Sequence, residues 1–146
     1  MAQHALPILV SDMEDPNPLV RALALRTLSY IHVREFVEAT ATPLHDLLRD
    51  PDPYVRKTAA FCVAKLYDHD RDLVENSVVK NGGGGLIEGL NALLRDDNPT
   101  VVSSALVSLM DIWERSDTIK LTIDHANASK IVQILPDCSE YVLLVE

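Results

Sequence analysis

The sequence is poor in cysteine and in aromatic residues: two of its 146 residues are cysteine, and 5% are aromatic. Two cysteines cannot form a disulfide framework, and Cys62 lies in an apolar helical pattern that is typical of a reduced core thiol. The chain also lacks a basic leader segment and any apolar run long enough to span a bilayer. We therefore expect a cytoplasmic protein.

Basic residues are scarce as well, since 13 Lys and Arg face 22 Asp and Glu, which gives a formal net charge of −9. Binding to nucleic acid or to anionic lipid needs a dense basic surface that neutralises phosphates. We therefore expect no nucleic-acid partner, and a local basic patch stays open as an alternative. The acidity itself is explained most simply by solubility.

Aliphatic residues are abundant, and three segments share a phrase in which Asp or Asn precedes a proline: DPNPLVRALA, DPDPYVRKTAA and DDNPTVVSSAL. Proline fits the first turn of a helix because it fixes φ and lacks an N–H. The residue before it can cap the free N–H groups of that turn. The phrase predicts three helix starts: Pro18, Pro53 and Pro99. The predicted caps are the residues before them: Asn17, Asp52 and Asn98.

After each proline, five positions that are mostly apolar recur at the same offsets. Steps of four, three, one and three place these positions on one face of a helix. The first copy supplies Val20, Ala24, Thr27, Leu28 and Ile31. The second copy supplies Val55, Ala59, Cys62, Val63 and Leu66. The third copy supplies Val101, Ala105, Ser108, Leu109 and Ile112. We expect this face to pack against neighbouring repeats.

Another amphipathic segment precedes the later copies, Phe36–Asp50 before the second and Leu86–Asp97 before the third. The starts of successive copies lie 35 and 46 residues apart. Two helices at a period in this range are typical of HEAT or armadillo repeats. We therefore predict an all-α fold: an α-solenoid of HEAT/armadillo-type helix pairs with about three to four repeats, as a single α-solenoid fragment over residues 1–146.

The longer second interval contains four consecutive glycines, Gly82–Gly85, which predict a surface loop inserted between repeats. A phosphate-binding loop is disfavoured because a preceding strand and the Gly-Lys-Ser/Thr ending are missing. The acidic stretch Asp68–Asp72 lacks the glycine and the distant glutamate of a calcium loop. We interpret it as the cap of the helix that follows.

Residue types that carry chemistry are not arranged for it in this sequence. The five histidines share no helix face at metal-ligand spacing, and no serine or cysteine has the sequence context of a nucleophile. The sequence therefore predicts no catalytic, cofactor-binding or metal-binding residues, no cofactor and no enzymatic activity.

Two arginines, Arg21 and Arg56, lie at the same offset from their prolines. One interpretation is a ladder in which each arginine reaches back to the acidic turn of a neighbouring repeat, at Asp15 or Asp50. The alternative is a basic surface for lipid headgroups or an acidic partner. The third copy has Val102 at this offset, so the ladder is predicted to stop there.

Both ends of the chain resemble interrupted repeats. Asn127–Glu140 is similar to the first helix of a fourth unit, and the final YVLLVE supplies no second helix for it. The segment HALPILVSDM is similar to the last part of a helix. Because solenoid ends without polar capping repeats expose apolar faces, we expect the isolated chain to be marginally stable or to self-associate.

The stretches DPNPLVRALALRTLSYIHV and DPDPYVRKTAAFCVAKLYD resemble the N-terminal trunk of beta-adaptin, the large beta subunit of the clathrin-associated adaptor complexes. Two later segments, DDNPTVVSSALVSLMDI and KIVQILPDCSE, continue the similarity. The Gly82–Gly85 stretch and the final YVLLVE depart from the family pattern, and the family's trunk is several times longer.

The resemblance implies an adaptor-complex trunk segment, a non-catalytic scaffold that assembles with a second large, a medium and a small subunit in clathrin-coated vesicle formation and intracellular protein transport. It implies that clathrin is contacted only through regions absent here and that membranes are reached through the complex. The implied location is cytoplasmic, peripheral on Golgi, endosomal or plasma-membrane coated vesicles. The alternative is a generic HEAT-repeat protein-binding scaffold of another coat or of a transport receptor.

Overall fold

Helices make up the regular structure of this chain. The computed structural model describes residues 2–77, 84–118, 128–129 and 131–133, and no strand occurs among them. The predicted fourth unit and the final YVLLVE lie largely or wholly outside these residues. In chain order the elements are α1 (Ala2–Asp12), α2 (Pro18–Ser29), α3 (Arg34–Leu47), α4 (Pro53–His69), α5 (Arg71–Glu75), α6 (Leu86–Ala92), the 3₁₀ turn η1 (Leu93–Arg95) and α7 (Pro99–Arg115).

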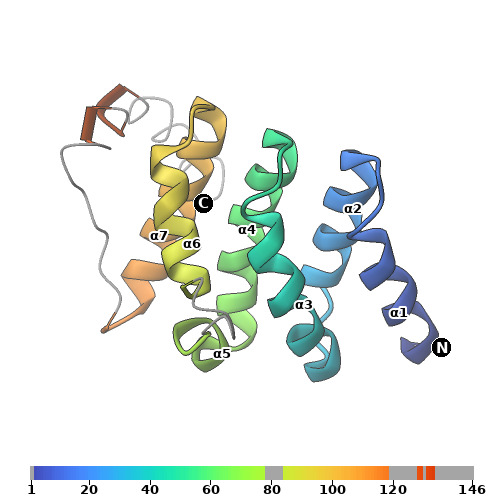
Figure 1. Ribbon diagram of the computed structural model, residues 1–146. Helices are drawn as coiled ribbons and strands as arrows, with labels where there is room; N and C mark the ends of the chain where they lie inside the picture. Colours follow the sequence, from blue (N-terminus) through green and yellow to red (C-terminus); the bar gives the residue numbers. More distant parts are fainter. Residues whose placement is uncertain (1, 78–83, 119–127, 130, 134–146) are drawn as a thin grey trace.

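The helices form pairs that stand in a row, α1 with α2, α3 with α4, and α6 with α7 (Figure 1). Helices α2, α4 and α7 pack side by side in one layer, and α1, α3 and α6 lie in the other. Stacked helix pairs of this kind bury an apolar face that one pair cannot bury alone. The predicted all-α solenoid is confirmed.

Proline and a polar cap begin each helix of the α2–α4–α7 layer, as the sequence predicts. The Asn17 side chain accepts a hydrogen bond from the Leu19 N–H at 3.0 Å. The Asp52 carboxylate accepts one from the Tyr54 N–H at 2.8 Å. Asn98 accepts from two N–H groups at the start of α7. Each cap satisfies donors that a helix N-terminus leaves free.

Two further prolines lie inside helices of the other layer, and the sequence pattern did not predict these positions. Pro7 lies within α1 and Pro43 within α3. An interior proline removes one backbone hydrogen bond and usually costs about 3 kcal/mol. In α3 the residue after Pro43, Leu44, is fully buried in the core. Proline therefore marks helix starts in one layer only.

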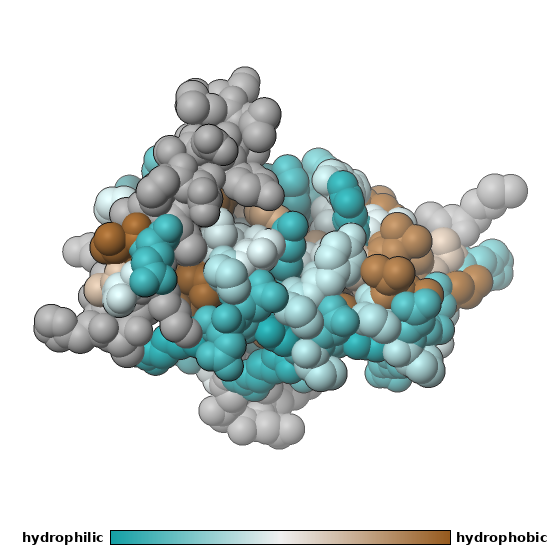
Figure 2. All heavy atoms as spheres, turned by 90° about the horizontal axis from the view of Figure 1, so that it is seen from above, coloured by the Kyte–Doolittle hydropathy of each residue, from teal (hydrophilic) through white to brown (hydrophobic). Residues whose placement is uncertain are grey.

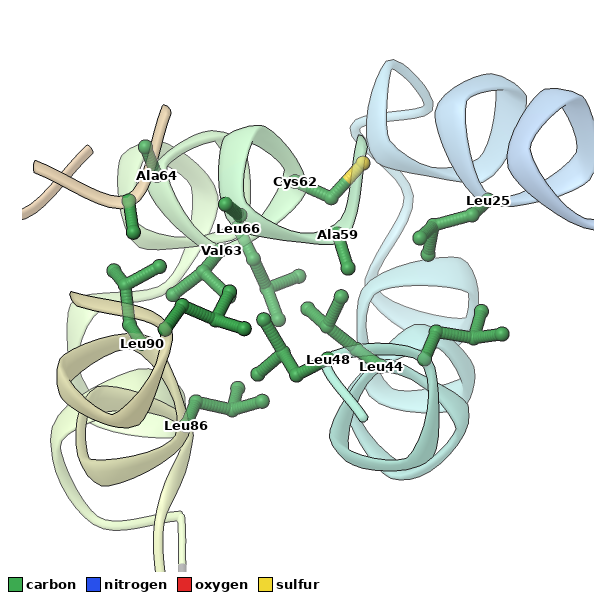
Figure 3. Close-up of a cluster of buried hydrophobic side chains, with 14 of the residues drawn as sticks. Leu25, Leu44, Leu48, Ala59, Cys62, Val63, Ala64, Leu66, Leu86 and Leu90 are labelled. Carbon is green, nitrogen blue, oxygen red and sulfur yellow. The ribbon is translucent and has the colours of Figure 1, made fainter. Parts of the chain in front are cut away.

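Part of the core lies where α3, α4 and α6 meet, with α2 alongside (Figure 3), and the buried apolar cluster continues along α7. Leu66 of α4 points between the leucines of its neighbours and is 1% exposed. The labelled core residues come from α2, α3, α4 and α6 and from the residue that follows α3: Leu25, Leu44, Leu48, Ala59, Cys62, Val63, Ala64, Leu66, Leu86 and Leu90. All five predicted face positions are buried in the second and in the third copy.

The first copy departs from this pattern at three positions, because Val20 and Ile31 are half-buried and Thr27 is exposed. Ala24 and Leu28 are buried, but Thr27 is exposed although its counterparts Cys62 and Ser108 are buried. Cys62 lies against α2, where Ser29 interacts with its thiol. Thr27 occupies the corresponding side of α2, which faces away from α4, and no described helix covers it. The same repeat position is therefore part of the core in one repeat and part of the surface in another.

The longer second interval holds an extra helix as well as glycines. Helix α5 begins after Asp70, whose carboxylate accepts a hydrogen bond from the Leu73 N–H at 2.9 Å. The predicted cap in the acidic stretch is thus confirmed. Of the glycine run, Gly84 and Gly85 are described and lead directly into α6, and Gly84 has a φ of +73°, which favours glycine. Gly82 and Gly83 lie outside the described residues.

Candidate functional site

The described residues contain no group of three or more His, Cys, Asp or Glu side chains placed to hold a metal ion. Two histidines do meet: the His32 and His69 rings lie 3.8 Å apart between centroids, and His69 Nε2 lies 2.9 Å from the Ser29 carbonyl oxygen. Sequence spacing does not indicate this pair, because its members lie on different repeats. Their contact joins the C-terminal ends of α2 and α4.

The three proline-led turns share one geometry, and we call them turn 1 (Asp15–Asn17), turn 2 (Asp50–Asp52) and turn 3 (Asp96–Asn98). In each turn the first aspartate accepts a hydrogen bond from the backbone N–H two residues later, at 2.8 to 2.9 Å. The carboxylate is thereby fixed in orientation and keeps further acceptor positions. Each turn therefore presents an oriented carboxylate.

Arg21 joins turn 1 to turn 2. Its Nε and Nη2 donate to the two carboxylate oxygens of Asp50, each at 2.8 Å. Its Nη1 donates to the Asp15 carbonyl oxygen at 2.7 Å, within its own turn. The Arg21 side chain is 13% exposed and the Asp50 side chain 6%, so the pair is shielded from solvent. The hydrogen bond to Asp50 raises the pKa of the guanidinium.

Arg56 repeats this arrangement one unit later. Its Nε and Nη2 donate to the Asp96 carboxylate at 2.7 and 3.0 Å, and its Nη1 donates to the Asp50 carbonyl oxygen at 2.8 Å. Hydrogen bonding to Asp96 likewise raises the pKa of the Arg56 guanidinium. Two parallel N–H···O bonds of this kind fix geometry as well as adding energy.

The ladder exists, but its predicted direction was wrong. Each arginine places its fork on the carboxylate of the following turn, and it touches its own turn only through backbone carbonyl oxygens. The physical reason is that the carboxylates of turns 2 and 3 lie within reach of the arginine on the preceding repeat. Val102, at the same offset in α7, is buried and has no charge to extend the ladder.

A groove of about 760 Å³ runs over the outer face of α2, α4 and α7. Exposed aromatic rings of Tyr54 and Phe61 line it, beside the basic residues Lys57 and Lys65 of α4. Helix α7 contributes carboxylates, of which Asp111 has its pKa raised mainly by burial. Aromatic rings flanked by charges are common in protein-binding surfaces. The groove is the candidate interaction surface of this layer.

Arg115 lines the groove near the C-terminal end of α7. It pairs with Asp68 of α4 and with Asp111 on its own helix. Its guanidinium carbon also lies 5.5 Å from the centre of the buried Tyr67 ring, a cation–π contact. These contacts fix α7 against α4 at the end opposite the turns.

The end of the molecule at which the turns lie is mostly hydrophilic, and a hydrophobic patch lies over α1 and α2 (Figure 2). Leu19 and Leu23 of α2 are 62% and 65% exposed, and Ile8 of α1 is 62% exposed. Within the described part of the chain, no helix is both long enough and apolar enough to cross a membrane.

These features define a helical-repeat protein with surfaces suited to protein binding. The chain belongs to the family described as Cnd1, non-SMC mitotic condensation complex subunit 1, which matches residues 19–142. The family match agrees with the stacked helix pairs seen in the structure.

Individual relatives are beta subunits of adaptor complexes. The chain is 41% identical to AP-2 complex subunit beta of Schizosaccharomyces pombe over 97% of its length and 20% of the relative. It is 47% identical to AP-1 complex subunit beta of Dictyostelium discoideum over 89% of its length and 13% of the relative. It is 42% identical to AP-1 complex subunit beta-1 of Homo sapiens over 97% of its length and 14% of the relative. The resemblance to beta-adaptin is confirmed, and the chain spans a fifth or less of these relatives.

Proposed function

We propose that this chain is a trunk segment of an adaptor complex and acts as a non-catalytic scaffold. The observation that carries the proposal is the similarity to AP-1 and AP-2 beta subunits over 89 to 97% of the chain. Those relatives are named as subunits of complexes, so the role that we propose for this chain is binding to other proteins. Repeated helix pairs present long surfaces of this kind.

The proposed partners are a second large, a medium and a small adaptor subunit. The groove over α2, α4 and α7 supports this because it combines exposed Tyr54 and Phe61 with charges of both signs. Such a surface suits a folded protein better than a phosphate-rich ligand. Membrane association is proposed to be indirect, at Golgi, endosomal or plasma-membrane coated vesicles, and contact with clathrin is not assigned to these residues.

Co-purification tests the proposal. The tagged chain is expressed in its source cells, and bound proteins are identified by mass spectrometry. Recovery of medium, small or second large adaptor subunits is the expected result. Recovery of chaperones alone would contradict it, and recovery of another coat or transport assembly would favour a generic HEAT-repeat scaffold instead.

A matched pair of variants locates the contact. Phe61→Asp places a charge in the groove at a residue that is 36% exposed. The control is Val33→Asp, an exposed apolar residue that does not line the groove. We expect Phe61→Asp to reduce recovery of adaptor subunits and Val33→Asp to leave it unchanged. Equal recovery with both variants would place the contact elsewhere on the chain.

A further inference from the structure

Turn 1 has the geometry of turns 2 and 3 but receives no arginine fork within the described residues. The Asp15 carboxylate accepts the Asn17 N–H at 2.8 Å, as Asp50 and Asp96 accept theirs. Asp50 and Asp96 each bind a guanidinium from the preceding repeat. Asp15 is oriented in the same way, and no ion pair is formed by its carboxylate in the described part of the chain.

The side of α2 next to turn 1 is an uncovered packing surface, which we call the open α2 edge (Val20, Leu23 and Thr27). Leu23 is 65% exposed, and Thr27 is exposed as well. Their counterparts on α4 are Thr58, which is half-buried, and Cys62, which is buried and lies against Ser29 of α2. Figure 2 shows a hydrophobic patch over α1 and α2 at this end of the molecule.

We propose that turn 1 and the open α2 edge together form a docking site for an arginine-bearing helical repeat. The partner helix would pack on the open α2 edge and place its guanidinium fork on the Asp15 carboxylate. Charge complementarity at Asp15 and the apolar surface beside it select this class of partner. The inference rests on the internal geometry of the repeats and does not depend on the adaptor assignment.

A second copy of the chain fits this site less well. Arg21 and Arg56 are already engaged with Asp50 and Asp96. The remaining helix of that layer, α7, has the uncharged Val102 at the arginine position. A copy stacked by its α7 side would therefore leave Asp15 without a guanidinium. The occupant is a different repeat that carries arginine three residues after its helix-starting position.

The first test extends the full chain at its N-terminus with a second copy of residues 1–33. The copied Arg21 then precedes turn 1 as the native Arg21 precedes turn 2. Hydrogen exchange read by mass spectrometry is expected to slow in native α2, and Asp15→Asn in the extended chain is expected to weaken docking roughly tenfold. The copied Arg21→Gln should do the same, and the two changes together should add little.

Glu14→Gln is the matched control, because Glu14 is an exposed carboxylate next to Asp15. It should leave docking unchanged. Asp15→Asn in the unextended chain should also be silent, since an amide oxygen still accepts the Asn17 N–H. The proposal would be overturned if the effects of Asp15→Asn and of the copied Arg21→Gln on docking were additive. It would also be overturned if the added helix pair were folded and hydrogen exchange in native α2 were unchanged.

A second probe covers the case in which the added pair does not fold. A side-chain-stapled helical peptide of residues 16–33 is titrated into the unextended chain, with Arg21 intact or replaced by Gln. Binding that weakens roughly tenfold on either Arg21→Gln in the peptide or Asp15→Asn in the chain is expected. If neither probe protects α2, the proposal is wrong. Concentration-dependent protection of α2 in the chain alone would overturn it in favour of a second copy.

Discussion

Arg21 and Asp50 lie 29 residues apart in sequence and form a two-pronged pair, with both N–H···O distances at 2.8 Å. Asp50 belongs to the turn of the following repeat, so the pair ties one repeat to the next. Arg56 and Asp96 form the same link one unit further on. The angle between successive helix pairs is therefore set by polar contacts at the turns as well as by apolar packing.

Replacing Arg56 with lysine should destabilise the chain, because an ammonium group cannot form the planar fork on Asp96 and reach the Asp50 carbonyl oxygen at the same time. We expect the melting temperature to fall by roughly 3–6 °C, which corresponds to loss of about 1 kcal/mol in a chain of this size. Circular dichroism at 222 nm measures the change.

Arg34→Lys is the control for this substitution. Arg34 pairs with Glu38 on the same helix, and their side chains are 89% and 55% exposed. An ion pair this exposed contributes little to stability. A melting temperature that falls equally for both variants would show that the Arg56 link has no special role.

Truncation of Leu66 to alanine should cost about 2–5 kcal/mol of unfolding free energy, because it opens a cavity where α3, α4 and α6 meet. Urea denaturation measures the loss. Leu19→Ala removes the same atoms from a side chain that is 62% exposed, and it should change the unfolding free energy by less than about 0.5 kcal/mol. Similar losses for the two variants would contradict the core assignment.

Asn98→Ala should cost about 1 kcal/mol, since two N–H groups at the start of α7 lose their acceptor. Asn98→Asp keeps an acceptor oxygen and places a negative charge at the helix N-terminus, so stability should be retained. Urea denaturation of the three proteins distinguishes capping from a general effect of substitution. An aspartate variant as unstable as the alanine variant would count against the cap.

Cys62 should resist alkylation in the native chain, because burial raises the pKa of its thiol to about 11. The thiol is read alone in a Cys138→Ser variant, with and without denaturant at pH 8. We expect rapid reaction only after unfolding, since the thiolate is the reactive form. Equal rates in the two conditions would show that Cys62 is accessible.

The same thiol makes stability depend on alkaline pH. The pKa of a cysteine thiol in an unfolded chain is about 8.5. The pKa of Cys62 in the folded chain is about 11. The thiol of the unfolded state therefore loses its proton at a lower pH than the thiol of the folded state, and this deprotonation stabilises the unfolded state. The contribution of Cys62 to the free energy of unfolding is complete below about pH 8.5 and decreases as pH rises toward 11. Cys62→Ala should remove this part of the pH dependence in urea denaturation between pH 8 and 11.

The helix starts were predictable because their signals are local. A proline fixes φ and an adjacent Asn or Asp supplies an acceptor, so Pro18, Pro53 and Pro99 needed no tertiary information. The shared apolar face was predictable for the same reason, since it follows from helical periodicity. The solenoid then follows because each of these helix pairs has a face that only another pair can cover.

The errors concern features that depend on neighbours in space. Arg21 points forward to Asp50 because the carboxylate of turn 2 lies within its reach, and no sequence offset encodes that direction. Thr27 is exposed because no described helix covers its side of α2, although it matches the buried Cys62 in sequence. The His32–His69 contact and the groove also arise only when separate repeats are stacked.

Arg21 and Asp50 are 29 residues apart, Arg56 and Asp96 are 40 apart, and both links have the same geometry despite this difference of 11 residues. The additional residues, α5 among them, enter where α4 connects to α6, at the far end of the helices from the turns. The links between repeats are made at the turns. The connection at the opposite end of the helices can therefore change in length without altering how the helix pairs stack.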